Sequence, residues 1–189
     1  NTSTIHAVKV KGLTPGKQYR YRVFAQEVLK HTGYKIIYGS YASTDVYYRK
    51  PLTFHTCNPQ APATSFVMVN DIHGDNKLLE DLMSRCNLTQ TDFVLFNGDM
   101  LSFINSEDQL FKGFMDTAVR LFASEIPMYY ARGNHETRGV FATEIQRYFS
   151  PCQEHLYYAF RQGPVYCIVL DTGEDKPDSD IEYAGITQY

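Results

Sequence analysis

Several features are missing or scarce in this sequence, and each absence excludes a class of protein. No apolar run reaches the length of a membrane span, and no signal peptide is visible at Asn1, so we expect that any leader was removed before this numbering begins. Basic residues are too few to favour a long nucleic acid as partner, because 18 Lys and Arg stand against 21 Asp and Glu, for a formal charge of −3.

Paired cysteines are also missing. The four cysteines lie far apart and form no C-x-x-C pair, which argues against a structural zinc knuckle. One or two disulfides in an oxidising compartment and four free thiols both stay open. Cys167 lies inside the apolar run 165–170, so we expect a buried free thiol there. The cysteines are Cys57, Cys86, Cys152 and Cys167.

The first 56 residues have the pattern of an all-β domain. Strands are expected at 5–11, 18–28, 34–41 and 51–56. Pro15 and Gly16 supply a turn over which Leu13 and Tyr19 can fold, as in the tyrosine corner of sandwich domains. The order Gly-Leu-x-Pro and then Tyr resembles the second half of a fibronectin type III-like domain. The resemblance implies a partial all-β fibronectin type III-like sandwich over residues 1–56.

The pattern changes after residues 57–64, a proline-containing stretch that we interpret as an interdomain linker. Strands and helices then alternate through residues 65–189, which predicts a layered α/β domain. The acidic tail 173–180 is expected to be a solvated loop, or else the rim of an active site. The expected strands are 65–70, 93–97, 127–131, 156–160 and 165–171, and the expected helices are 75–86, 107–124 and 143–149.

The strand at 65–70 ends in polar side chains that suit a metal ion. Asp71 and His73 lie two residues apart, so in extended backbone they point to the same side and can reach one ion together. A carboxylate beside an imidazole favours Zn, Fe or Mn over Ca or Mg. The simpler alternative is a turn with an Asx hydrogen bond.

Two later strands end in the same way. The strand 93–97 is followed by Gly98 and Asp99, and the strand 127–131 leads to Gly133-Asn134-His135-Glu136. Asp71 and Asp99 are 28 positions apart and Asp99 and Asn134 are 35 apart, which leaves room for one helix in each interval. Three successive strands thus deliver metal-capable side chains to the same edge of a sheet, where open α/β sheets place their chemistry.

These blocks resemble the calcineurin-like metallophosphoesterase superfamily, whose motifs are D-x-H, G-D, G-N-H-[D/E], then a lone His and G-H-x-H. With the β domain in front, the arrangement is similar to purple acid phosphatases. Two departures stand out: Ser102 and His73 occupy positions where those enzymes have an iron-binding Tyr and a Gly, and the two downstream histidine motifs do not occur in these 189 residues. We therefore expect the partner that completes the site to be the C-terminal part of the same domain.

The resemblance implies two divalent or mixed-valence metal ions, of Fe, Zn or Mn. Asp71 and His73 would hold the first ion, Asp99 would bridge, and Asn134 would hold the second ion and face the substrate. His135 would act catalytically by donating to a phosphoryl or leaving oxygen.

The neighbours of these residues have more than one interpretation. Glu136 could orient His135 or raise its pKa, or it could be a plain helix-start carboxylate. Arg132 could bind a substrate phosphate or form a surface salt bridge. The other residues considered are Asn70, Asp75 and Asn97 as supporting groups, and His55 and His155, which have no motif around them.

The implied activity is hydrolysis of phosphoesters, and of phosphomonoesters in particular, with a metal-bound hydroxide as nucleophile. A phosphodiesterase or nucleotidase on the same scaffold and a non-catalytic binding module are the alternatives. The chain alone is expected to bind metal poorly and to turn over little. The resemblance also implies a periplasmic or secreted protein, and Asn1-Thr2-Ser3 and Asn87-Leu88-Thr89 match glycosylation sequons.

Overall fold

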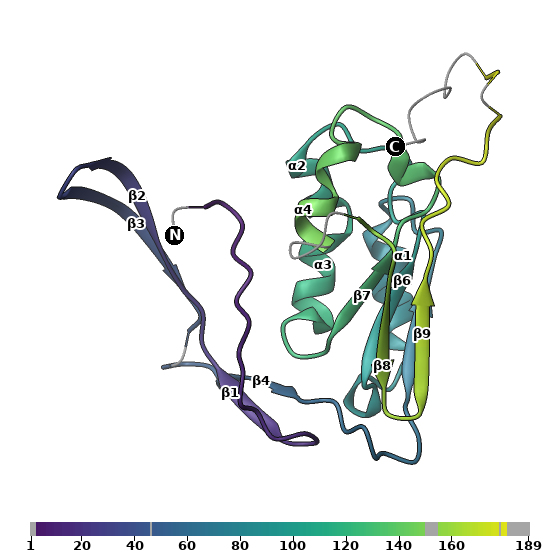
Figure 1. The fold of residues 1–189 in the computed structure, drawn as a ribbon, viewed down its shortest axis with the longest axis horizontal. Coiled ribbons are helices and arrows are strands. Elements are labelled where there is room, and N and C mark those ends of the chain that lie inside the picture. Colours follow the sequence, from purple (N-terminus) through teal and green to yellow (C-terminus); the bar gives the residue numbers. More distant parts are fainter. Residues whose placement is uncertain (1–2, 46, 150–154, 178, 181–189) are drawn as a thin grey trace.

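The computed structural model describes residues 3–45, 47–149, 155–177 and 179–180. Figure 1 shows a compact α/β part, which holds β5 to β9 and the helices, and a strand-rich N-terminal part, which holds β1 to β4. The α/β layering predicted for the second part is confirmed. The strand-rich character of the first part is confirmed as well, while its fibronectin-like identity and the boundaries at 57–64 stay predictions.

The centre of the α/β part is a three-stranded parallel sheet in the order β5-β6-β7. Its strands are β5 (Phe66–Val69), β6 (Phe93–Asn97) and β7 (Met128–Ala131), each within one residue of the predicted bounds. The register pairs Val69 with Phe96 and Asn97 with Ala131. Because the three strands are parallel and adjacent, their carboxyl ends lie at one edge of the sheet.

The helix predicted at 75–86 is α1 (Asn76–Ser84), which buries Leu79 and Met83. Asp75 is its N-cap, since the Asp75 carboxylate accepts a hydrogen bond from the Leu78 amide at 2.9 Å. Asp75 therefore begins the helix, and the support for metal ligands considered above stays a prediction.

The helix predicted at 107–124 is present, but half of it is π-helical. It runs through α2 (Glu107–Leu110), η2 (Phe111–Met115), α3 (Asp116–Ala118) and η3 (Val119–Ala123), where η2 and η3 are π segments. The buried stripe has a strict spacing of four residues, which would drift around a helix of 3.6 residues per turn. The wider π turns keep that stripe aligned on the core. Its members are Leu110, Phe114, Ala118 and Phe122.

Beyond β7 the chain forms short helical turns and an antiparallel hairpin. The helix predicted at 143–149 is divided into η5 (Ala142–Glu144) and α4 (Gln146–Phe149). The hairpin consists of β8 (Tyr158–Gln162), two residues later than predicted, and β9 (Val165–Val169). The Tyr158 hydroxyl donates to the Tyr130 carbonyl at 2.8 Å and accepts from the Tyr130 amide at 2.9 Å, which attaches the hairpin to β7. The remaining 3-10 turns are η1 (Leu88–Gln90) and η4 (His135–Thr137).

The N-terminal part contains two separate two-stranded sheets, and two strand predictions for it were wrong. β1 (Gln18–Tyr21) pairs with β4 (Leu52–His55), and β2 (Phe24–Thr32) pairs with β3 (Lys35–Ser43). The predicted strand 18–28 therefore divides between two sheets. Residues 5–11 form no strand, because an alternating apolar pattern forms no strand-to-strand hydrogen bonds unless a partner strand lies beside it.

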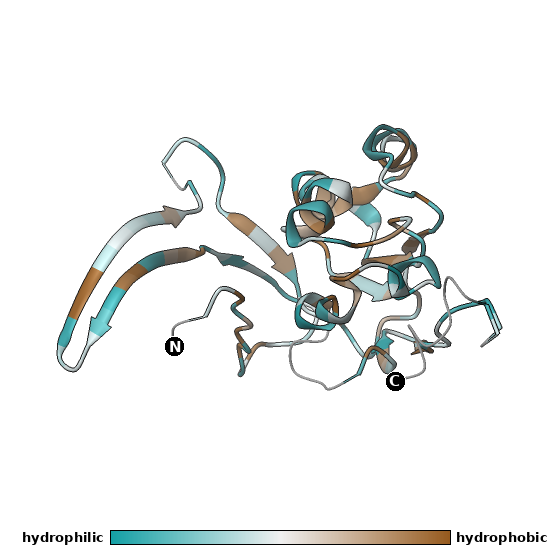
Figure 2. Ribbon diagram, turned by 90° about the horizontal axis from the view of Figure 1, so that it is seen from above, coloured by the Kyte–Doolittle hydropathy of each residue, from teal (hydrophilic) through white to brown (hydrophobic). Residues whose placement is uncertain are grey.

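Three local features of this part stand out. The Thr14 amide donates to the Tyr19 hydroxyl at 2.8 Å, so Tyr19 does fold back over the predicted turn. The β2–β3 hairpin projects from the molecule with nearly all of its residues exposed (Figure 1), and Figure 2 shows apolar stretches along both strands. β4 contacts the α/β part, because Glu125 accepts from the Thr53 amide at 2.7 Å.

Two further predictions concern the state of the cysteines and the length of the helices. Cys57, Cys86 and Cys167 are half-buried free thiols, so Cys167 is free as predicted but not fully buried, and Cys152 lies outside the described residues. None of the helices in the described ranges has the length and apolarity to cross a bilayer.

We predict that Phe96→Ala strongly destabilises the α/β part. Phe96 is completely buried on the central strand, with ring centroids of Phe114 and Phe122 at 5.6 and 5.8 Å. Removing such a ring costs about 3–5 kcal/mol of unfolding free energy. Urea denaturation followed by circular dichroism measures the loss. Phe103→Ala is the matched control, since that ring is 48% exposed and its loss should cost much less.

Candidate metal centre

The loops that follow β5 and β6 are joined by backbone hydrogen bonds at the carboxyl edge of the sheet. The Asp71 amide donates to the Gly98 carbonyl at 3.2 Å, the His73 amide to the Asp99 carbonyl at 3.0 Å, and the Gly74 amide to the Met100 carbonyl at 2.8 Å. The predicted ligands of the first loop, Asp71 and His73, and that of the second loop, Asp99, are therefore held against each other by the main chain before any side chain contributes.

Three of the predicted metal ligands have left-handed backbone. Asp71, His73 and Asp99 have φ of 57°, 51° and 55°, and they are the non-glycine residues with positive φ in the described part of the chain. This conformation costs an L-residue about 1–2 kcal/mol. Asp and His tolerate it better than most residues, and such outliers gather at functional sites. The strain marks the same three side chains that the motifs selected.

The glycines of the second and third motifs allow the β6 and β7 loops to touch. A Cβ atom on Gly98 would lie 2.7 Å from the Gly133 Cα, and Gly98 has a φ of 84°. A Cβ atom on Gly133 would lie 2.6 Å from the Asp99 amide nitrogen. Neither contact is sterically possible, so both positions require glycine.

Glu136 connects the same two loops with a buried carboxylate. Its Oε2 accepts from the Asp99 amide at 2.9 Å and from the Gly133 amide at 3.0 Å, while Oε1 accepts from the Leu101 amide at 3.0 Å. Burial raises the pKa of Glu136, and the three backbone hydrogen bonds oppose that rise. The expectation that this carboxylate orients His135 is corrected, because it binds main-chain amides instead.

The geometry of the cluster fits a metal site. His73, Asp99 and His135 offer ligand atoms that lie within 4.8 Å of one another, and the Asp71 Oδ1 is 3.8 Å from the His73 Nε2. Two ligands of one ion, each about 2.1 Å from it, can lie no more than about 4.2 Å apart. Asp71 and His73 fit around one ion as they stand. The larger group of Asp71, His73, Asp99 and His135 can bind metal only if its side chains move slightly or are divided between two ions.

Ser102 contacts both histidine rings. Its hydroxyl lies 3.0 Å from the His73 Nδ1, and its carbonyl oxygen lies 3.1 Å from the His135 Nδ1. The two rings meet edge to face, with centroids 4.8 Å apart and planes at 82°. In both rings Nδ1 thus contacts the same residue, and the Arg138 Nη1 also lies 3.2 and 3.4 Å from the two nitrogens of the His135 ring.

Asn134 is oriented by the acidic tail. Its Nδ2 donates to Asp175 Oδ1 at 3.1 Å and to Glu174 Oε1 at 3.4 Å. Because ionised carboxylates only accept hydrogen bonds, Nδ2 must face them, and the amide oxygen Oδ1 is directed to the other side. That oxygen is the atom a cation would bind.

The acidic tail forms a rim of this site, so the predicted solvated loop is corrected for Glu174. Arg138 donates two hydrogen bonds to the Glu174 carboxylate, at 2.7 and 2.8 Å, and the Glu174 side chain is only 3% exposed. The adjacent guanidinium holds the pKa of Glu174 well below its usual range.

Arg132 forms a salt bridge, but not a surface one. Its guanidinium makes a bidentate pair with Asp171 at 2.8 and 3.0 Å, and both side chains are 14% exposed. Asp171 follows β9, so it is a further carboxylate at a strand end, a signal the sequence offered and we did not use. Arg132 thus pairs with Asp171, and its predicted contact with a substrate phosphate stays a prediction.

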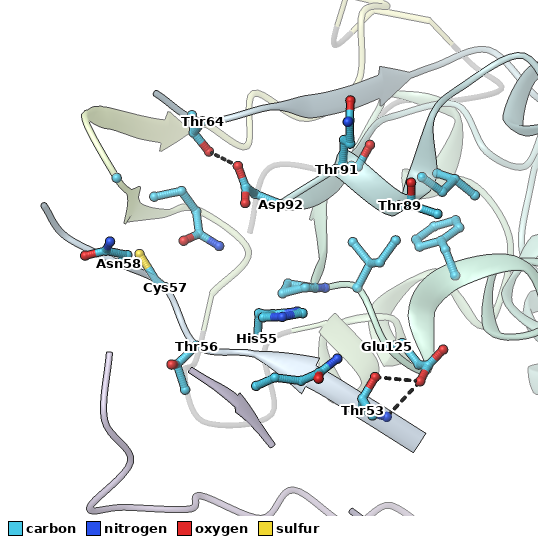
Figure 3. Close-up of a pocket in the computed structure, with 18 of the residues that line it drawn as sticks. Thr53, His55, Thr56, Cys57, Asn58, Thr64, Thr89, Thr91, Asp92 and Glu125 are labelled. Atoms are coloured by element: carbon cyan, nitrogen blue, oxygen red, sulfur yellow. Dashed lines mark hydrogen bonds between the residues drawn. The ribbon is translucent and has the colours of Figure 1, made fainter. Parts of the chain in front are cut away.

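The remaining candidates lie apart from the cluster or contact it only locally. Asn70 donates to the Asp71 carboxylate, Asn97 is exposed at the end of β6, and His155 hydrogen-bonds the Tyr157 carbonyl at 2.7 Å. His55 lines a different hollow of about 750 Å³, beside residues that precede β6 and β7, and the predicted metal ligands do not line it (Figure 3).

Comparisons with known proteins agree with this geometry. Residues 64–183 match the family model of the calcineurin-like phosphoesterases. The chain belongs to the calcineurin-like phosphoesterase family. No curated protein sequence matches this phosphoesterase chain.

A solved structure with a similar fold is that of the purple acid phosphatase PPD1 from seeds of yellow lupin (Lupinus luteus). It superposes with a TM-score of 0.63 at 17% sequence identity, over 92% of this phosphoesterase chain and 33% of the lupin chain. The present chain thus spans about a third of the length of that protein.

We predict that Glu136→Gln destabilises the phosphoesterase chain by at least about 2 kcal/mol, because a neutral amide offers one acceptor oxygen to three buried backbone donors and brings an N–H group against at least one of them. Thermal and urea unfolding measure the loss. Glu144→Gln is the matched control, since Glu144 is 41% exposed in a surface pair with Arg147 and should change stability by less than about 0.5 kcal/mol. Equal stability of both variants would contradict the structural function given to Glu136.

Proposed function

We propose that this chain contributes to a metal-dependent hydrolase of phosphoesters, with small phosphomonoesters as the preferred substrates. The observation that supports this most strongly is the gathering of Asp71, His73 and Asp99, all on left-handed backbone, at the carboxyl edge of one parallel sheet. Membership of the calcineurin-like phosphoesterase family supports the same reaction class.

The proposed ligands divide between two ions of Fe, Zn or Mn. Asp71 and His73 hold the first, Asp99 serves both, and Asn134 holds the second through its amide oxygen. When bound, such ions lower the pKa of water and neutralise the charge of a phosphoryl group. Carboxylate, imidazole and amide oxygen are suitable ligands for these metals.

The chain's own residues then bind and orient the substrate. His135 lies beside His73, with ring centroids 4.8 Å apart, within reach of a phosphate that contacts the ligands. As a hydrogen-bond donor it would stabilise charge that develops on a phosphoryl or leaving oxygen. Asn134 adds a ligand without adding negative charge, which favours an anionic substrate.

We also propose that these 189 residues by themselves bind metal weakly and turn over little. The second ion would have only Asp99 and Asn134, because the G-H-x-H motif of the family does not occur in the sequence. By resemblance to acid phosphatases, the protein would work in the periplasm or outside the cell.

We predict that Asp99→Asn lowers the affinity of the chain for Zn²⁺ or Mn²⁺ by at least about tenfold. Even groups that only support a ligand contribute roughly 10–100-fold to affinity, and a direct ligand contributes no less. Equilibrium dialysis with metal analysis measures the change. Asp108→Asn is the control, because Asp108 is 70% exposed in a surface pair with Lys112 and should bind metal like the parent chain. Equal affinity of both variants would remove Asp99 from the ligand set.

We predict that His135→Ala in the complete protein lowers kcat for an aryl phosphate by at least about 10²-fold while the metal content is kept, as for a lost proton donor. A loss of metal together with activity would instead make His135 a ligand. Full hydrolysis in both the Asp99 and His135 variants would favour a non-catalytic binding module. A greater rate on phosphodiesters or nucleotides than on monoesters would favour the alternative substrate class.

A further inference from the structure

We propose that Ser102 is a positioning residue that fixes the tautomer of two histidines at once, and this rests on the proposed function. Its hydroxyl holds the proton on Nδ1 of His73, and its carbonyl holds the proton on Nδ1 of His135. Both rings then direct Nε2 to the site: on His73 its lone pair faces an ion, and on His135 it donates to the substrate when the ring is protonated. Ser102 thus orients the proposed metal ligand His73 and its neighbour His135 through two different atoms.

The assignment for His135 follows from the chemistry of the carbonyl. A carbonyl oxygen only accepts hydrogen bonds, so the contact of 3.1 Å between the Ser102 oxygen and the His135 Nδ1 requires a proton on that nitrogen. The Arg138 Nη1 lies 3.2 and 3.4 Å from the two nitrogens of the same ring. An N–H group that points at the lone pair of one ring nitrogen would lie much farther from the other ring nitrogen. Because the Arg138 Nη1 is nearly equidistant from both, it does not donate to Nδ1.

The assignment for His73 follows from the direction of its ring. The His73 Nε2 lies 3.8 Å from the Asp71 Oδ1, so a cation shared by these two residues must bind the lone pair of Nε2. The proton then belongs on Nδ1, where the Ser102 hydroxyl accepts it at 3.0 Å. Histidines that bind metals generally donate their other N–H group in this way.

Ser102 is well placed for this function because its neighbours are fixed. The preceding Leu101 is buried, and its amide donates to the Glu136 carboxylate at 3.0 Å. The Met100 carbonyl accepts from the Gly74 amide at 2.8 Å, which holds the loop against the residues around His73. These contacts hold the Ser102 backbone, and with it the carbonyl oxygen, beside the two rings.

The test is ¹⁵N NMR of the imidazole groups in the protein with no metal added, at a pH where the rings are neutral. We expect both His73 and His135 as Nδ1–H tautomers. Ser102→Ala should return His73 toward the Nε2–H form that dominates in water and leave His135 unchanged, because the alanine keeps the carbonyl. Ser102→Thr, which keeps the hydroxyl, should restore the parent spectrum of His73.

The second readout is affinity for Zn²⁺, which should fall by about 10–100-fold in Ser102→Ala and recover in Ser102→Thr. Three NMR results would each overturn the proposal: His73 as Nε2–H in the parent protein, His73 unchanged in Ser102→Ala, or both rings altered together. If the tautomers behave as expected but the protein binds no metal, the positioning function of Ser102 holds. The proposed hydrolase function is then contradicted.

Discussion

The arrangement of the site depends on one buried carboxylate. An ionised Glu136 with no partners would be prohibitively costly in the core, so it must keep the amides of Asp99, Leu101 and Gly133 around it. Those amides belong to the loops after β6 and β7. The contact that satisfies the charge therefore also fixes the distance between Asp99 and the Asn134-His135 pair, so the protein itself organises the site.

Strain in the backbone opposes the hydrogen bonds that hold these loops together. Left-handed backbone at Asp71, His73 and Asp99 costs about 1–2 kcal/mol per residue. Three main-chain hydrogen bonds between the β5 and β6 loops, and the three bonds to Glu136, each contribute about 0.5–1.5 kcal/mol, more where the acceptor is charged. The two totals are similar in size, so these hydrogen bonds are enough to offset the backbone strain.

The sequence predicted the strand tips well because a parallel sheet brings successive carboxyl ends together, whatever lies between them. Asp71, His73 and Asp99 could thus be grouped from spacing alone. The partners of Glu136 could not, because they are backbone amides, which leave no trace in residue identity. The wrong predictions of a strand at 5–11 and of one continuous strand at 18–28 have a related cause. An alternating pattern shows which face of a strand is apolar but does not identify the partner strand.

The charges near the site favour two ions over one. The arginines closest to it are already paired, Arg132 with Asp171 and Arg138 with Glu174. The Asp71 and Asp99 carboxylates would leave two negative charges facing an anionic substrate, since Glu136 is buried against main-chain amides. One dication would at best neutralise both of them, whereas a pair of dications would leave a positive site that can hold a phosphate. Because these two arginines are paired with carboxylates, we propose that the metal ions supply most of the positive charge that binds the phosphate.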